Sequence, residues 1–594
     1  MTIDLQPNSP GAVASLSDLT RAAGAQRQAK SYGLTLLHLF CIGIFAAFLC
    51  WGQTGQAPIN GDDVGVLQRT MLQHTNYNYD YVVWTQLRLH VVGLLYGEYK
   101  LAGSSLETAN LIWLGIYVLS AFAGYAYLRK VFSPTVALTG AIFYLCYSSK
   151  YEPLTWWSAG AYTVIWLAFF GLMYAFESKW SYRVKSVVVT AIIAASMYLY
   201  EVFIVLVPVL SALMLLRRKR EVDRLSKSDW ILAALPIIFV AVHVLTLAST
   251  PEPIFNPSKG VRGGASLVQR IGRGFSSAID ATMGPAHNRT VKQASGVYKE
   301  FYQRETPALN LIMCAGIAAF MISLVLGARV AINSAPSVVA VNETALIGAV
   351  ALFVSAFIGF VSNYCITPSR LTGIPSIGLM LLVCAALEWT FIFARKFSGV
   401  KRSAMAVVAT LVPLMALAVS VREVKAFHSL LRQAGEVNAF DLELANRIKS
   451  LHPVARQGDE IYVRMPKAPG EATGRWQNFW SGFNSGRAFE TFWYLYDVPA
   501  GKIDFKCTRS PAIGENVKMQ EIVDRWSEKG STRQVYPFLI DIQKNVMPIT
   551  EIILTDVEGR ELKRIDFTKQ FAGYSGEVAP PQRIPVTQLP AKAF

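Results

Sequence analysis

The 594-residue chain has few charged residues for its length. Asp, Glu, Lys and Arg make up 16% of it, whereas hydrophobic residues make up 53%, and its mean hydropathy is +0.34. Soluble domains ordinarily contain about 25% charged residues. This shortage of charge excludes a soluble enzyme of this size and predicts a chain that lies largely in a lipid bilayer.

Cysteine and the common cofactor motifs are also scarce. The seven cysteines include no Cys-x-x-Cys pair, and most fall in apolar runs, so neither a zinc site nor a disulfide framework is predicted. No glycine-rich dinucleotide fingerprint is found. The sequence therefore predicts no required cofactor. Its net charge of +16 is assigned to contact with anionic membrane lipids and not to nucleic acid.

Long apolar runs fill the first two thirds of the chain. A bilayer core of about 30 Å requires about 20 apolar residues of helix, and the uncharged segment 33–52 meets this requirement. Residues 1–30 are polar and lack a cleavage site, which predicts a cytoplasmic tail before an uncleaved first span. Further apolar runs lie near 109–128, 134–148, 159–176, 186–200, 202–216, 229–248, 308–328, 345–362, 372–394 and 403–421. We predict about eleven transmembrane helices between residues 31 and 421.

Basic residues are concentrated on alternate loops, with the densest block at 217–220. Under the positive-inside rule these loops face the cytoplasm. The intervening loops then face the exterior, including a first outer loop at 53–108 and a second long one at 249–307. An odd number of crossings also leaves everything after residue 421 outside.

The stretch 186–216 is too long for one span and short for two, and Glu201 interrupts it. Both of its flanks, Lys185 and Arg217, belong to cytoplasmic loops by the same rule. A tight hairpin or a broken re-entrant pair fits better than a single crossing. Glu201 is costly in an apolar run unless it is paired, so it is a candidate for function or for a structural pair.

The last third, residues 422–594, has a different pattern. Residues 436–451 predict an amphipathic helix, 459–465 and 502–507 predict strands, and 551–567 predict a hairpin that turns at Glu558-Gly559. These elements predict a small extracytoplasmic α+β domain.

Two adjacent acids, Asp62 and Asp63, follow the first span at the outer membrane–water boundary. Near them, residues 79–96 predict a helix that lies in the interface and carries Arg88 and His90. A partly desolvated carboxylate beside a second one gains proton affinity, which suits a general base. The alternative is that Asp62 only caps a helix that starts at Val64.

This layout resembles the GT-C superfamily of integral membrane glycosyltransferases, which use polyprenyl-phosphate sugars. The shared features are a cytoplasmic start, a first span, a long outer loop that opens with an acidic motif, many further spans and an outer C-terminal domain. The resemblance implies that Asp62 or Asp63 is catalytic. Oligosaccharyltransferases of the superfamily carry Trp-Trp-Asp, whereas this chain has Trp156-Trp157-Ser158, which argues against protein N-glycosylation by oligosaccharide transfer.

Transfer from such a donor needs a base for the acceptor hydroxyl and a cation for the departing phosphate. The outer-side cations that could bind the phosphate are Arg370, Lys150, Arg69 and Arg88. Arg370 is preferred because two prolines and a glycine surround it in an irregular loop. Interfacial anchoring is the alternative role of Arg370 and Lys150.

Weaker candidates are Tyr151 and Glu152, which follow Lys150, and His90, which has no second His or Cys at metal spacing. No metal site is predicted. A divalent cation held by Asp62 and Asp63 stays an alternative to metal-free catalysis.

The sequence therefore predicts a polytopic α-helical enzyme of a bacterial inner membrane. The expected reaction moves a hexosyl or pentosyl group from a polyprenyl-phosphate-linked sugar to a glycan, lipid or protein acceptor outside the cytoplasm. Two other classes stay open. One is a transporter or flippase of lipid-linked saccharide, which requires a polar path through several spans. The other is a glycan polymerase or ligase, which would rely on outer-loop arginines and not on the early acids.

Overall fold

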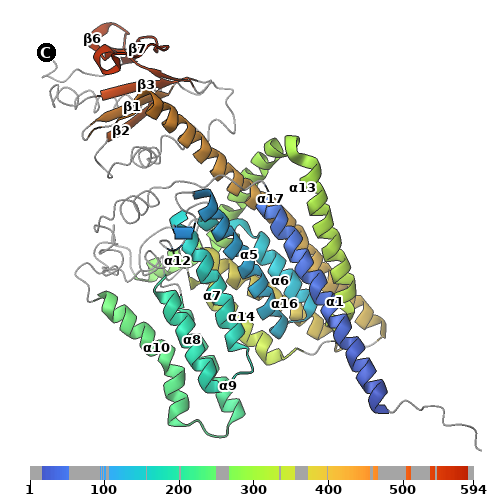
Figure 1. Cartoon of the computed structure of the whole chain (residues 1–594). Helices are drawn as coiled ribbons and strands as arrows, with labels where there is room; N and C mark the ends of the chain where they lie inside the picture. Colours follow the sequence, from blue (N-terminus) through green and yellow to red (C-terminus); the bar gives the residue numbers. More distant parts are fainter. Residues whose placement is uncertain are drawn as a thin grey trace, which may run out of the picture.

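The structure is a computed structural model, and it consists of a helical bundle with a β-rich domain at one end (Figure 1). The residues that it describes are 16–51, 94, 97, 100–101, 106–154, 157–199, 203–248, 267–333, 336–354, 372–397, 399–454, 456, 459–465, 504–509, 535–541 and 545–585.

Most described helices of the bundle overlap a predicted apolar run. In chain order the described helices are α1 (Leu16–Cys50), α5 (Leu106–Val131), α6 (Pro134–Cys146), α7 (Ala161–Phe176), α8 (Tyr182–Met197), α9 (Leu206–Glu221), α10 (Lys227–Ala248), α12 (Leu267–Met283), α13 (Pro285–Asn333), α14 (Val338–Leu352), α16 (Gly373–Ala394) and α17 (Gly399–Leu451). Helix α12 and the first part of α13 instead lie in the predicted outer loop 249–307.

Five segments of the described chain are long and apolar enough to cross a membrane: Tyr32–Cys50, Asn110–Val131, Lys227–Thr246, Pro307–Gly327 and Gly373–Ala394. Three shorter apolar helices, α6, α7 and α14, accompany them. The predicted helical membrane fold is therefore confirmed. The total of about eleven crossings stays a prediction.

The doubtful stretch 186–216 forms two helices, α8 and α9, of 16 residues each. At 1.5 Å per residue each is about 24 Å long, and α10 packs against both. A pair of short helices is what the basic residues at both flanks predicted. Glu201, between the two helices, lies outside the described residues.

Helix α6 is the centre of the bundle. All 13 of its residues are buried, and it contacts α1, α5, α13, α16 and α17. Pro134 at its start fits the first turn of a helix, where no backbone donor is needed. A short turn, η4 (Ser148–Lys150), follows its end and thus begins inside the bundle.

Helices α14 and α16 make the closest contact in the bundle, because Gly348 and Gly378 face each other. A Cβ on Gly378 would lie 2.4 Å from the backbone N of Leu352 and 2.6 Å from the backbone O of Gly348. Small residues at such a crossing let two membrane helices approach closely.

Helix α17 is 53 residues long, about 80 Å at helical rise. It leaves the bundle and ends at the β-rich domain (Figure 1). The amphipathic segment 436–451 is the last part of this helix and not a separate element. The domain boundary drawn at residue 421 falls inside it.

The β-rich C-terminal domain contains two small sheets. The first has the order β2 (Asp504–Arg509), β1 (Glu460–Met465), β3 (Val535–Ile540), β4 (Val546–Pro548), with β1 parallel to both β2 and β3. The second has the order β6 (Glu561–Asp566), β5 (Glu551–Thr555), β7 (Gln582–Pro585). Strands β5 and β6 form the predicted hairpin, and Gly559 adopts φ 83° in its turn, where other residues are strained.

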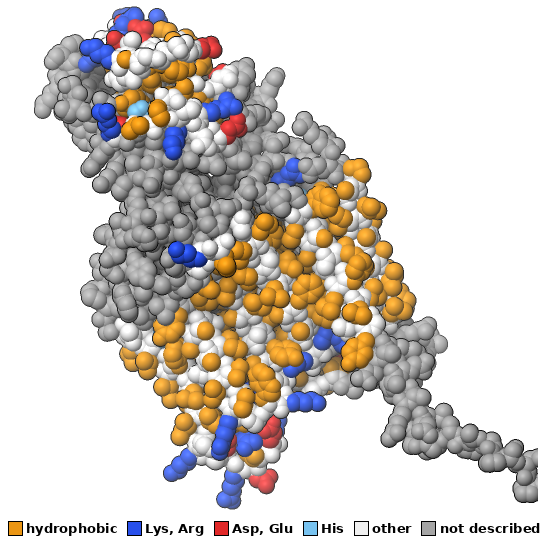
Figure 2. All heavy atoms as spheres, viewed as in Figure 1, with side chains coloured by type: hydrophobic (Ala, Val, Ile, Leu, Met, Phe, Trp, Pro, Cys, Tyr) orange, Lys and Arg blue, Asp and Glu red, His pale blue; other side chains and the backbone are white. Residues whose placement is uncertain are grey.

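Figure 2 shows apolar side chains spread over one face of the bundle and charged ones gathered at the end away from the C-terminal domain. Helix α10, for example, exposes Trp230, Ile238 and Leu245. Such contiguous exposed apolar surface marks a lipid-facing wall. The bundle thus has the surface of a membrane-spanning domain, and the β-rich C-terminal domain lies at one end of it (Figure 1).

Candidate functional site

Most of the predicted site residues lie outside the described residues, so their roles stay predictions. They are Asp62, Asp63, Arg69, Arg88, His90, Glu201 and Arg370, together with the side chain of Glu152. The structure describes two predicted residues, Lys150 and the partly buried Tyr151.

Lys150 ends the turn η4 and is fully buried. Its Nζ donates hydrogen bonds to the backbone O of Tyr147, at 3.0 Å, and to that of Tyr144. Three tyrosine rings and one phenylalanine ring surround the ammonium, with centroids 4.5 to 6.0 Å away: Tyr144, Tyr117, Tyr147 and Phe427. The aromatic faces attract the cation. A lysine that only anchors the chain at the membrane interface would keep its ammonium in water, whereas the ammonium of Lys150 is enclosed by protein.

Burial strongly affects the protonation of Lys150. It lowers the pKa of this amine from 10.5 to about 7, although the Cys146 thiol and the Glu423 carboxylate both favour the charged form. The side chain therefore changes charge near neutral pH. An enclosed amine of this kind at one end of a bundle is a candidate for function.

Glu423 of α17 reaches the start of the same turn. Its Oε2 accepts hydrogen bonds from Ser148 Oγ at 2.6 Å and from Ser148 backbone N at 3.2 Å, and its Oε1 lies 3.1 Å from His287 Nε2. Burial alone would raise the pKa of Glu423, but hydrogen bonding and attraction by His287 and the bonds from Ser148 keep it below its usual value. Glu423 is thus a carboxylate at neutral pH.

Ser148, Lys150, His287 and Glu423 form what we call the Lys150 cluster. They come from three predicted outer regions: the loop after α6, the loop 249–307 and the end of the apolar run 403–421. The ring of His287 stacks on Tyr147 with centroids 4.9 Å apart. The structure thus brings these three regions to one end of the bundle, as the predicted topology requires.

Several polar atoms beside the cluster are buried without a hydrogen-bond partner among the described residues. They are His287 Nδ1, Ser149 Oγ and Thr282 Oγ1. Native proteins satisfy most buried polar atoms, so an unsatisfied group calls for an explanation such as a ligand.

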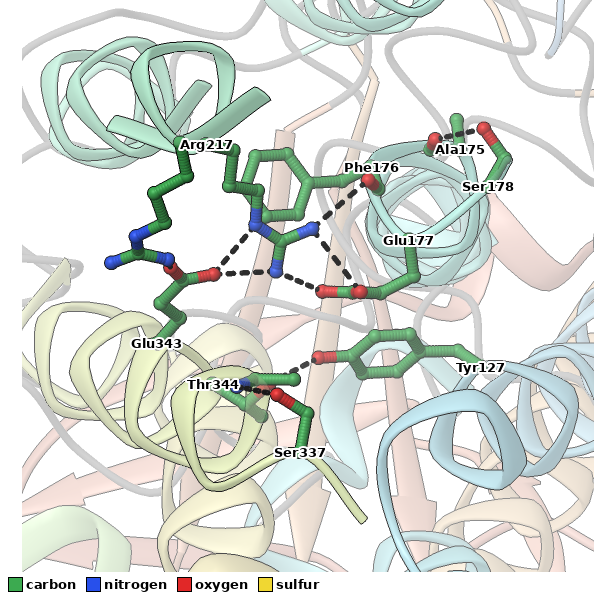
Figure 3. Close-up of polar contacts among 11 residues, drawn as sticks. Tyr127, Ala175, Phe176, Glu177, Ser178, Arg217, Ser337, Glu343 and Thr344 are labelled. Carbon is green, nitrogen blue, oxygen red and sulfur yellow. Dashed lines mark hydrogen bonds and ion pairs between the residues drawn. The ribbon is translucent and has the colours of Figure 1, made fainter. Parts of the chain in front are cut away.

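A second group of buried charges lies at the opposite end of the bundle, and we call it the Arg217 network (Figure 3). Arg217 donates to Glu177 at 2.6 Å and to Glu343 at 2.6 Å, and Arg220 donates to Glu343 at 2.8 Å. Arg217 also bonds the backbone O of Phe176 at the end of α7. These contacts join α7, α9 and α14.

Sequence reasoning missed Glu423 and His287. Each has a sequence feature that could have indicated a site residue: Glu423 is the first acid after an apolar run, and His287 lies near the start of a long helix that begins in a predicted outer loop. No group of three or more His, Cys, Asp or Glu side chains capable of holding a metal ion occurs in the described part of the chain. The question of a cation at Asp62 and Asp63 lies outside that part.

Neither a family model nor a curated protein matches this sequence. Two solved structures resemble the fold, both of ArnT from Cupriavidus metallidurans. The apo structure shares 13% identity over 86% of this chain and 93% of that chain, with a TM-score of 0.35. The structure bound to undecaprenyl phosphate shares 11% identity over 87% and 93%, with a TM-score of 0.31. At such low TM-scores the likeness bears on neither function nor site.

Proposed function

We propose that this protein is a membrane glycosyltransferase that moves a sugar from a polyprenyl-phosphate donor to an extracytoplasmic hydroxyl. The observation that carries the proposal is the Lys150 ammonium, enclosed in the bundle at the end nearest the outer domain. A cation at the depth of the lipid headgroups can bind a phosphate while the prenyl tail stays in the membrane.

The hydrogen bonds of Lys150 suit this role. An ammonium has three N–H donors, and two of them bond to Tyr144 and Tyr147. The third has no acceptor among the described residues. A phosphate oxygen would complete the set, and in a water-poor site a charge-assisted bond of this kind is strong.

The two early acids supply the other half of the reaction. Asp62 or Asp63 removes the proton of the acceptor hydroxyl as the hydroxyl oxygen attacks the anomeric carbon. The bond from that carbon to the phosphate oxygen breaks, and the polyprenyl phosphate leaves with the electron pair. Lys150, with Arg370 in the neighbouring outer loop, neutralises the growing charge on the phosphate.

The orientation follows from the positions of the basic residues. The block 217–220 lies at the end of the bundle opposite the outer domain, and basic loops face the cytoplasm. The Lys150 cluster and the outer domain then face the exterior of a bacterial inner membrane. The acceptor is a glycan, a lipid or a protein on that side.

The positions of buried carboxylates weigh against a transporter. Among the described residues, Glu343 and Glu388 lie at the end with the basic loops, where they bond to Arg217 and Arg395, and Glu423 lies at the other end. A transporter needs ionisable groups along a path through the spans. Among the described residues these three acids lie at the two ends of the bundle and form no acidic path between them, and the candidate spans also bury His38 and His243.

The test uses the full chain in lipid with a panel of polyprenyl-phosphate sugars and measures released polyprenyl phosphate. Asp62→Asn and Asp63→Asn should each leave expression unchanged, and at least one should lower release by about 10²- to 10⁴-fold, the range for loss of a general base. Asp223→Asn, which removes an equal charge from an exposed residue of the basic end, is the matched control and should behave as wild type. Absence of release with every donor, or release unaffected by both outer substitutions, contradicts the proposal.

A further inference from the structure

The turn that carries Lys150 is anchored from outside its own helix. Residues 148–150 follow the end of α6, and Glu423 of α17 accepts both the backbone N–H and the hydroxyl of Ser148. On the far side of the turn, Thr372 donates to the backbone O of Ser149 at 2.5 Å. The position of the ammonium therefore depends on α17 and on the start of α16.

Glu423 also acts on Lys150 through its charge. It is one of the two groups that favour the charged form of this amine, against the effect of burial. One carboxylate thus does two things: it holds the backbone of the turn, and it supplies a negative charge that favours the protonated form of a buried amine. His287, at 3.1 Å, holds this carboxylate in place from α13.

We propose that Glu423 is a positioning residue for donor binding: through Ser148 it fixes the turn that presents Lys150, and through its charge it keeps the ammonium able to bind a phosphate. This inference rests on the proposed function, in which Lys150 binds the phosphate of the donor. It assigns to α17 a role in the site in addition to its role as the connection to the outer domain (Figure 1).

The titratable groups that face Lys150 determine how phosphate binding by Lys150 depends on pH. Those described are Tyr144, Cys146 and Tyr147 from α6 and the residue after it, Tyr117 from α5, Glu423 from α17 and, through Glu423, His287 from α13. Arg422, also on α17, acts electrostatically on Tyr147. Cys146 and Glu423 both favour the protonated form of Lys150 and neither belongs to its aromatic cage, but Glu423 is the one that also holds the turn through Ser148.

The direction of the pH effect follows from the sign of that charge. The pKa of Lys150 is about 7, so the ammonium is lost as pH rises through neutrality, and phosphate binding weakens with it. Glu423→Gln removes the attraction that favours the ammonium, and the pKa of Lys150 falls further. The pH above which binding weakens should move to a lower value.

Substitutions at three positions separate the two effects. Glu423→Gln keeps an oxygen that can accept from Ser148 but loses the charge, so its main effect should be on the pH profile. Ser148→Ala loses the hydroxyl bond and keeps the backbone bond, so affinity should fall without a pH shift. Glu423→Ala loses both and should show both effects, with affinity about ten- to a hundredfold lower, the range for residues that orient metal ligands. Glu443→Gln, on the exposed part of α17 in a pair with Arg447, changes net charge equally and is the control.

The measurement is the affinity of the full chain in lipid nanodiscs for farnesyl phosphate, from mildly acidic to mildly alkaline pH, with the KM and kcat for sugar release from an active donor measured alongside. The expected result is an acid shift of the binding profile and a raised KM in Glu423→Gln, with Glu443→Gln equal to wild type.

If wild type binds and Glu423→Gln keeps the wild-type profile, the positioning role is wrong while the proposed function stands. If wild type fails to bind the probe and releases no sugar, the proposed function is wrong and this role with it. Equal loss of binding at every pH, accompanied by loss of folded protein, would mean that Glu423 only stabilises the fold.

Discussion

The two buried polar regions of the bundle, the Lys150 cluster and the Arg217 network, satisfy their charges differently. In the Arg217 network the guanidinium of Arg217 donates to two carboxylates and a carbonyl, and Glu343 receives a second arginine. In the Lys150 cluster the bonds of the ammonium to other described residues all go to carbonyls, and nearby polar atoms such as His287 Nδ1 have no partner in the described part.

This difference separates a structural role from a functional one. A network in which each charge has a bonded partner needs no ligand to be stable. The effect of the Arg217 network is to join α7, α9 and α14 at the end of the bundle that carries the basic block 217–220. A buried group with a spare donor, or with an unpaired nitrogen, is stable only if something else completes it. We therefore assign the Arg217 network to stability and the Lys150 cluster to ligand binding.

Removal of Arg217 should have the largest effect on stability. Arg217→Met leaves Glu177 without its partner, and the side chain of Glu177 is only 11% exposed. Loss of one partner of a buried pair costs about 3 kcal/mol. The stability of the detergent-solubilised protein, followed as the folded fraction during heating, should fall accordingly, while transfer per folded molecule stays near the wild-type value.

A second variant checks the cause. Arg217→Met combined with Glu177→Met removes both charges of the pair, and apolar replacement of a whole buried pair is often neutral. Part of the lost stability should return. If Arg217→Met unfolds at the wild-type temperature but transfers no sugar, the assignment of the Arg217 network to stability is wrong.

Lys150→Met should reverse this pattern. Removal of one preorganised donor to a developing negative charge costs about 10²- to 10³-fold in rate, so release of polyprenyl phosphate should fall by that factor. Stability should change by less than about 1 kcal/mol, because an apolar side chain replaces an amine whose burial is already unfavourable. The check is transfer and thermal unfolding measured on the same preparation. If Lys150→Met instead lowers stability and leaves transfer unchanged, Lys150 has a structural role, as Arg217 does.

Sequence periodicity was sufficient for most of the fold. Apolar length located most of the helices, although not α12 or the first part of α13, and the basic flanks of 186–216 indicated two helices where hydropathy alone was ambiguous. Gly559 indicated the β5–β6 turn because positive φ is rare in other residues. The continuity of α17 was missed, because the change from an apolar to an amphipathic pattern near residue 421 does not mark the end of a helix.

The site was harder to predict, because its contacts join distant positions. Ser148 and Glu423 are 275 residues apart, and His287 and Glu423 are 136 apart. Nothing local marks such pairs in one sequence. Lys150 could be proposed from its place in an outer loop, but its enclosure by aromatic rings depends on α5 and α17 packing against α6.

The smallest effect is expected for Arg220, the outermost member of the Arg217 network. Its side chain is 53% exposed, and Glu343 keeps Arg217 as a partner when Arg220 is replaced. No buried charge is left unpaired, so Arg220→Gln should lower stability by no more than about 0.5 kcal/mol, as for exposed ion pairs. High salt should reduce even this loss, because it screens exposed charges and not enclosed ones. A loss as large as that of Arg217→Met, unchanged by salt, would show that pairing of the buried carboxylate depends on both arginines and that the network is less fully satisfied than its geometry indicates.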